Sequence, residues 1–277
     1  MNSSLSTKEP VTREPQAGRS VSYKSVALPA EHGSWSLVSE PILLGLLIAP
    51  SWAGVALVVA AFTLFLLNRP LKIFWADSRR GRRYQRTRMA GRFLLIYGGV
   101  AVVGGVAALI LGGWRPFIPF AVAAPLLLIF MYYDQRPGRH WQAELLAPAA
   151  FASIVSSVAL AGGFSWIVSA ALWGFMIARA VPAVLFVRAR LRLDKQKSVS
   201  PWGVAAAHML AVGLVALLVW AGWLPTTAVI ATLFLWGRAL WGLSGYRWRS
   251  SVKALGFLET GVGIFVVLLV AIGFWLS

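Results

Sequence analysis

Apolar residues recur along the chain in long runs that short polar segments separate. These runs cover residues 34–49, 51–68, 93–112, 116–133, 144–163, 165–187, 201–222, 225–243 and 254–276. Most approach 20 residues, which as α-helix span the roughly 30 Å hydrocarbon core of a bilayer. The first run is short and is stopped by Pro50. The pattern predicts an all-α polytopic membrane bundle of about nine transmembrane helices, with the lipid bilayer as its surroundings.

The first 25 residues differ from the rest of the chain. They are polar, of mixed charge and free of any apolar run, so they hold no hydrophobic region of a cleavable signal peptide. We therefore expect a disordered cytoplasmic tail over residues 1–25 and one transmembrane helical domain over residues 26–277.

Composition agrees with a membrane protein. The 277 residues are 58% hydrophobic and 13% charged, with a mean hydropathy of +0.72. Soluble domains run near 45–50% apolar and about 25% charged. The absence of cysteine excludes disulfides, thiolate metal sites and a cysteine nucleophile.

The distribution of basic residues predicts the orientation. The formal net charge is +17, yet all but two of the 26 Lys and Arg lie in the tail or after the second, fourth, sixth and eighth apolar runs, if Arg238 near the end of the eighth run is counted with the loop that follows. Arg115 follows the third run, and Arg179 lies inside the sixth. The positive-inside rule then places the N-terminus and the long loops in the cytoplasm, and this arrangement argues against nucleic acid as a partner.

Five polar residues lie too deep for ordinary loop positions. Asn68, Arg179 and Arg238 fall in the cytoplasmic third of their runs, and Glu144 and Glu259 lie near the starts of theirs. Buried charges normally face the interior of a bundle or a water-filled cavity, which predicts a polar pocket open to the cytoplasm. The alternative is that the arginines snorkel to the interface and the glutamates stabilise helix starts.

Two basic segments extend this predicted pocket. The first is Asn68-Arg69-Pro70-Leu71-Lys72 with Asp77 beyond it, and the second runs from Arg179 through Phe186 to Arg188 and Arg190. Guanidinium groups suit phosphate oxygens, so both segments are candidate ligand-binding sites. Attraction to anionic lipid surfaces and the setting of topology are the alternatives.

Glu31 and His32 stand side by side before the first helix. A carboxylate beside an imidazole is a candidate acid–base pair, although Glu31 could equally cap the helix and His32 pack against it. The three histidines are scattered, and no two acids are four residues apart on one helix. We therefore expect neither a metal site nor a cofactor.

These residues resemble a known family. Pro29 with Glu31-His32-Gly33-Ser34-Trp35 is similar to the P-x-E-H-G-A-W signature of YwiC-like bacterial membrane proteins, with Ser34 where alanine is usual. The likeness extends over about residues 27–277 and includes the basic segments listed here: 69–72, 80–87 and 188–192. The family has no settled activity, so the resemblance implies only a multi-pass protein of the bacterial cell membrane.

A more distant resemblance concerns topology. Nine helices with an inner N-terminus and polar segments after the second and sixth look like UbiA-type intramembrane prenyltransferases. Of their N-D-x-x-D motif, only Asn68 is present, and Arg69 and Lys72 replace the aspartates. Arg188 and Arg190 stand where the second acidic motif would be, and Tyr132 begins a stretch similar to their tyrosine-lysine-arginine segment. The resemblance therefore does not imply ordinary Mg²⁺-dependent prenyl transfer.

Three hypotheses follow. A divergent UbiA-like relative would bind an isoprenoid diphosphate or another anionic lipid, with Glu31 and His32 as acid–base groups; whether it is an enzyme is left open. Its phosphate-binding residues would be Asn68, Arg69, Lys72, Arg179, Arg188 and Arg190. A small transporter would instead have broken helices at the midplane. A non-catalytic scaffold would use its basic loops to bind anionic lipid or an acidic partner.

Overall fold

The computed structural model describes residues 23–29, 32–81, 84–134, 141–248 and 251–277, and these residues form helices without a strand. The helices are α1 (Tyr23–Ala27), α2 (His32–Ile48), α3 (Trp52–Arg79), α4 (Gln85–Gly112), η1 (Arg115–Phe117), α5 (Ile118–Asp134), α6 (Trp141–Phe151), α7 (Ser153–Ala161), α8 (Trp166–Asp194), α9 (Trp202–Trp220), α10 (Thr226–Leu243) and α11 (Val252–Leu276). Within the described ranges, eight helical stretches are long and apolar enough to cross a membrane, and α2 is a shorter apolar helix. The predicted all-α polytopic bundle is confirmed. Helix α1 begins at Tyr23, before the domain boundary expected at residue 26.

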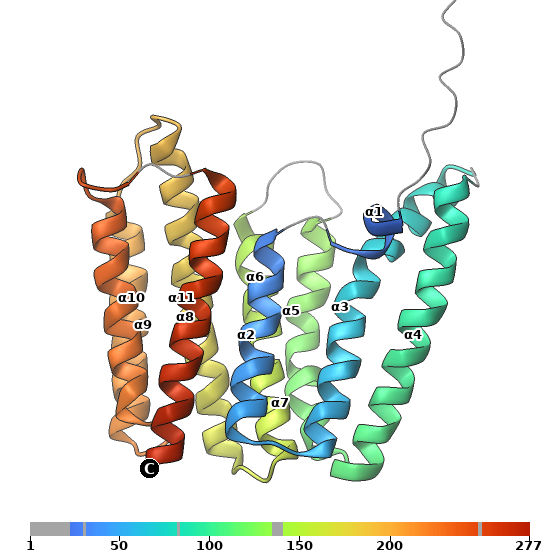
Figure 1. Ribbon diagram of the computed structural model, residues 1–277, viewed down its shortest axis with the longest axis horizontal. Helices are drawn as coiled ribbons and strands as arrows, with labels where there is room; N and C mark the ends of the chain where they lie inside the picture. Colours follow the sequence, from blue (N-terminus) through green and yellow to red (C-terminus); the bar gives the residue numbers. More distant parts are fainter. Residues whose placement is uncertain (1–22, 30–31, 82–83, 135–140, 249–250) are drawn as a thin grey trace, which may run out of the picture.

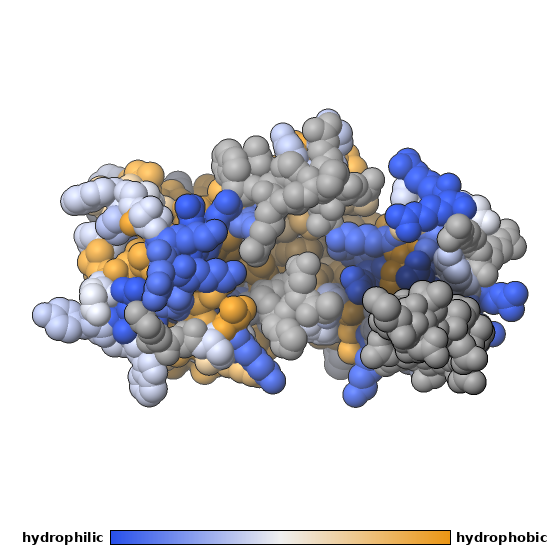
Figure 2. Space-filling view, turned by 90° about the horizontal axis from the view of Figure 1, so that it is seen from above, coloured by the Kyte–Doolittle hydropathy of each residue, from blue (hydrophilic) through white to orange (hydrophobic). Residues whose placement is uncertain are grey.

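The long helices stand side by side in an elongated bundle, with α9 and α10 at one end of its long axis and α4 at the other (Figure 1). Helix α2 packs on α11, α7 and α3, so the first membrane helix contacts the last. Helix α1 and the C-terminus lie at opposite ends of the helices (Figure 1). We call the end that carries α1 the basic end. Seen from there, hydrophilic residues gather in two groups along the long axis (Figure 2).

Three helices extend further at the basic end than the apolar runs predicted. Helix α3 continues to Arg79, α4 begins at Gln85, and α8 continues to Asp194. Most of the expected basic loops are therefore helical, because helix hydrogen bonds are internal and Lys and Arg are good helix formers in water. The end of an apolar run indicates where the membrane ends, but these helices continue beyond that point.

Asp77, which sequence analysis assigned to ligand binding, helps to hold the ends of α3 and α4 together. Its carboxylate is buried and accepts two hydrogen bonds from Arg86, at 3.0 and 2.6 Å, and one from the Thr87 hydroxyl at 2.6 Å. These contacts close the hairpin between α3 and α4. Asp77 thus has a structural task that accounts for its burial.

The run at 144–163, expected as one helix, forms two. Helix α6 ends at Phe151 and α7 begins at Ser153, shortly after Pro148, which cannot donate a backbone hydrogen bond. The carbonyl of Ala149 accepts from Trp173 Nε1 at 2.9 Å, and that of Ala150 from Ser153 Oγ at 2.7 Å. Side chains therefore satisfy backbone groups at this interruption, as an apolar environment requires.

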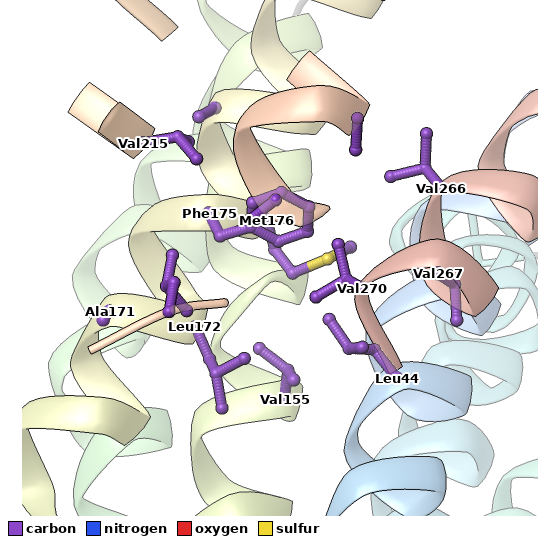
Figure 3. Packing of buried hydrophobic residues seen from close by; sticks show 14 of the residues in the cluster. Leu44, Val155, Ala171, Leu172, Phe175, Met176, Val215, Val266, Val267 and Val270 are labelled. Carbon is purple, nitrogen blue, oxygen red and sulfur yellow. The ribbon is translucent and has the colours of Figure 1, made fainter. Parts of the chain in front are cut away.

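The main apolar core joins α2, α7, α8, α9, α10 and α11. Leu44, Val155, Phe175, Val215 and Val266 are fully buried there and point toward one another (Figure 3). Leu44 lies one turn beyond Glu40 on α2, so charged residues and core share the same helices. The packed core thereby fixes the relative positions of the charged side chains described next.

Candidate functional site

The deepest charged contact joins α2 to α8. Arg179 Nη2 donates to Glu40 Oε1 at 3.1 Å, with only 4% and 6% of the two side chains exposed. Gly263 of α11 packs on this pair: a Cβ at that position would lie 2.0 Å from Glu40 Oε1. Three helices therefore meet at one ion pair, and glycine is the residue that leaves room for it.

A second ion pair links α10 to α11. Arg238 Nη1 donates to Glu259 Oε1 at 2.5 Å, and both side chains are nearly buried. The Arg238 guanidinium also stands 4.5 Å from the centre of the Phe186 ring on α8, a cation–π contact. Glu259 is one turn from Gly263 on α11, so the two ion pairs are neighbours.

Arg190 organises the basic end of α8. It donates to Asp194 Oδ2 at 3.2 Å, and also to the carbonyl oxygens of Gly242 and Trp248. Arg247 approaches the same Asp194 carboxylate at 3.6 Å. The segment that follows α10 is thereby tied to α8.

The predicted track of Arg179, Phe186 and Arg190 does form one row along α8, but each cation on it meets a carboxylate. Arg179 faces Glu40, Arg190 faces Asp194, and Arg238 beside Phe186 faces Glu259. Pairing offsets much of the desolvation cost of a buried charge, which is large for an unpaired one. These arginines therefore hold helices together in the described structure.

Arg188 and Glu144 form a more exposed ion pair between α8 and α6. Their distance is 3.1 Å, and 41% and 25% of the side chains are exposed. An exposed pair contributes little to stability, about 0–1 kcal/mol, so Arg188 can exchange its partner at small cost.

Asn68, Arg69 and Lys72 lie on α3, below its basic end, rather than in a loop. Arg69 Nε donates to the carbonyl oxygen of Ser25 in α1 at 3.4 Å. Helix α1 packs on α3 and α4, and Tyr97 of α4 donates to the Ala27 carbonyl at 3.3 Å. The short helix α1 therefore lies directly against the Arg69 segment.

The candidate acid–base pair falls at the edge of the described residues. Glu31 lies outside them, and His32 is the first residue of α2, without a described side chain. Three residues after His32, the Trp35 ring packs at a tilt on Phe62 and edge-on to Phe65 of α3, with ring centres 6.0 and 5.6 Å apart.

The structure divides the predicted pocket residues into two groups. Asn68, Arg69 and Lys72 lie on α3, which packs chiefly on α4 and α7, whereas Arg179 and Arg190 lie on α8, which packs on α9, α7, α10 and α6. Glu144 and Arg188 bridge α6 and α8 between these groups.

Sequence analysis missed two residues of the buried cluster. Glu40 is a carboxylate inside the apolar run 34–49, and that position is the signal that could have identified it as the partner of Arg179. Gly263 gave no such signal among 26 glycines. His208, one of the scattered histidines, is buried on α9, where its Nδ1 lies 2.9 Å from the carbonyl oxygen of Val204.

Comparison with known proteins agrees with the first resemblance. Residues 28–160 match the family model of the YwiC-like protein. No curated protein and no solved structure matches the chain. The YwiC-like resemblance is thus confirmed over the part that runs from the end of α1 to α7, whereas the likeness to UbiA-type prenyltransferases stays a prediction. Arg179, Arg238 and Glu259 lie beyond the matched residues.

Proposed function

We propose that this chain, with a YwiC-like match over residues 28–160, binds an anionic lipid by its phosphate group at the basic end. An isoprenoid diphosphate is the ligand class that the UbiA-like topology favours. The observation that carries the proposal is the packing of the described residues that flank the signature segment 29–35. Ser25 before it contacts Arg69 of α3, and Trp35 at its end contacts Phe65 of α3.

The two flanking contacts lie one helical turn apart. Before the segment, the carbonyl oxygen of Ser25 in α1 accepts from Arg69; at its end, the Trp35 ring of α2 packs edge-on to Phe65. Phe65 and Arg69 are four residues apart on α3 and so share a face. The described residues on the two sides of the signature segment therefore contact the same turn of α3, which supports a joint site.

The proposed roles follow from which basic residues lie near the signature segment and are at least partly exposed. Arg69 and Lys72 would contact the phosphate oxygens, with Asn68 as a further donor. Arg188 would join from α8, because its exposed partner Glu144 can be exchanged for phosphate. Glu31 and His32 remain the candidate acid–base groups if a reaction follows binding.

The transporter alternative has its own support. The interruption at Ala152 is a broken helix, and Arg238 Nε and Nη2 are buried without a hydrogen-bond partner among the described residues. However, the Ala149 and Ala150 carbonyls already accept side-chain hydrogen bonds, so they are not open to a solute. A transporter would retain its activity when Arg69 and Lys72 are replaced.

We expect the double variant Arg69→Ala/Lys72→Ala to retain isoprenyl diphosphate roughly 30-fold or more weakly than the unchanged protein. Each charge-assisted contact to phosphate contributes about 1.5–3 kcal/mol, and about 1.4 kcal/mol is tenfold in affinity. Native mass spectrometry of the detergent-purified protein with farnesyl diphosphate, with and without Mg²⁺, measures the retained ligand.

Arg115→Ala is the matched control, because Arg115 is an exposed arginine at the opposite end of the helices. It should leave retention unchanged. Equal retention by the double variant and the control would contradict the proposal and favour a scaffold whose charges attract lipid non-specifically.

A further inference from the structure

An apolar recess of about 530 Å³ opens on the outer side of the bundle between α3 and α4. Its walls come from Ala56 and Val59 of α3 and from residues of α4 between Leu95 and Ala107. Helix α4 is the outermost helix at this end of the bundle (Figure 1). The recess therefore faces the lipid phase of the membrane.

Two glycines of α4 give the recess its shape. At Gly104, a Cβ would lie 3.0 Å from the Ala56 carbonyl oxygen and 3.3 Å from the Ala60 Cβ, so α3 and α4 are in close contact there. At Gly99, a Cβ would meet no atom within 4 Å. Gly99 is therefore not required by packing between helices, and its missing side chain leaves the recess open.

Two cations stand above the recess at the basic end. Arg88 and Arg92 are exposed on α4, and neither has an acidic partner in the described part of the chain. They precede Gly99 by eleven and seven residues, spacings that place all three residues within roughly 20° of one helical face at about 3.6 residues per turn. The two positive charges therefore lie on the same face of α4 as the recess, closer to the basic end.

The length of the recess fits one lipid chain. From Leu95 to Ala107, α4 rises roughly 18 Å at about 1.5 Å per residue. One leaflet contributes roughly 15 Å, half of a hydrocarbon core of about 30 Å. A chain in the recess would therefore place its phosphate at the level of Arg92 and Arg88.

We propose that this recess, together with Arg88 and Arg92, is a binding site for an anionic phospholipid of the phosphatidylglycerol type. The acyl chain lies along Gly99 and Val103, and the two guanidinium groups hold the phosphate. A second copy of the chain fits less well, because α4 carries no acidic residue and symmetric pairing would bring arginine against arginine. The site uses none of the residues assigned above to the signature segment.

The test compares two lipids on purified protein. Native mass spectrometry after addition of phosphatidylglycerol or phosphatidylcholine counts the lipid that survives mild activation. We expect Arg88→Ala/Arg92→Ala to weaken phosphatidylglycerol retention roughly 10- to 30-fold and to leave phosphatidylcholine unchanged, since each cation near an anionic head group contributes to affinity.

A second variant tests the recess itself. Gly99→Leu fills it, and the open space at Gly99 lets the protein fold, so retention of phosphatidylglycerol should fall although both arginines remain. Gly105→Leu is the control, because Gly105 also has open space but does not line the recess. Unchanged retention in Gly99→Leu would overturn the proposal. A lipid-free dimer that Gly99→Leu abolishes would assign the recess to a second copy instead.

Discussion

Replacing Arg179 with leucine is expected to lower the midpoint of thermal unfolding by roughly 6–20 °C. Removal of one partner from a buried ion pair leaves the carboxylate of Glu40 buried without its countercharge, which costs about 3–5 kcal/mol. For a protein of this size, about 1 kcal/mol corresponds to about 2–4 °C. Fluorescence-detected size-exclusion chromatography of the detergent-solubilised protein after heating gives the midpoint.

The double variant Glu40→Leu/Arg179→Leu distinguishes the net stabilisation by the ion pair from the cost of leaving the Glu40 carboxylate buried without a partner. Because two apolar side chains of similar volume pack well in an apolar interior, we expect it to recover most of the loss. Arg188→Leu is the matched control: its pair with Glu144 is exposed, so the midpoint should move little. A single Arg179→Leu variant as stable as the unchanged protein would show that the pair does not join α2 to α8.

Gly263→Ala should destabilise the protein by about 3 kcal/mol or more, although alanine is the better helix former. Its Cβ would lie 2.0 Å from Glu40 Oε1 and 3.1 Å from Arg179 Nη2, so the carboxylate must move away from its partner. Overpacking alone costs about 1–3 kcal/mol, and disruption of the ion pair adds to it. The same heating assay measures the loss.

Gly261 supplies the comparison on the same helix. A Cβ there meets nothing within 4 Å, so Gly261→Ala should be neutral or stabilising by up to about 1 kcal/mol. If both alanine variants behaved alike, the close packing of α11 on the Glu40–Arg179 pair would be wrong.

Both predictions concern the junction between the matched and unmatched parts of the chain. Glu40 lies within residues 28–160, and Arg179 and Gly263 lie beyond them. The buried ion pair therefore joins the part that matches the YwiC-like family model to the C-terminal helices. Most cations of the proposed lipid sites, Arg69, Lys72, Arg88 and Arg92, lie on α3 and α4, and Arg188 on α8 is the one that lies beyond the matched residues.

The sequence by itself determined the class of protein and the approximate position of nearly every helix. Each membrane helix must satisfy its own backbone hydrogen bonds and present apolar side chains to lipid. A run of consecutive apolar residues is therefore enough to predict it, without knowledge of its neighbours. The same reasoning located Arg179, Arg238 and Glu259 at depths where a charge needs an explanation. It did not locate the ends of α3 and α8, because a helix can continue into water after the apolar run stops.

Only the tertiary structure decided which charges meet. Glu40 and Arg179 are 139 residues apart in sequence, and no periodicity relates them. Their contact exists because α2 packs beside α7 and α11, which brings its carboxylate to the inner face of α8. The same packing brings Arg238 to Glu259, whereas Arg88 and Arg92 on α4 have no acidic partner among the described residues. A pairing between residues far apart in sequence depends on which helices are neighbours. Hydrophobicity does not specify these neighbours, because it is similar in every membrane helix.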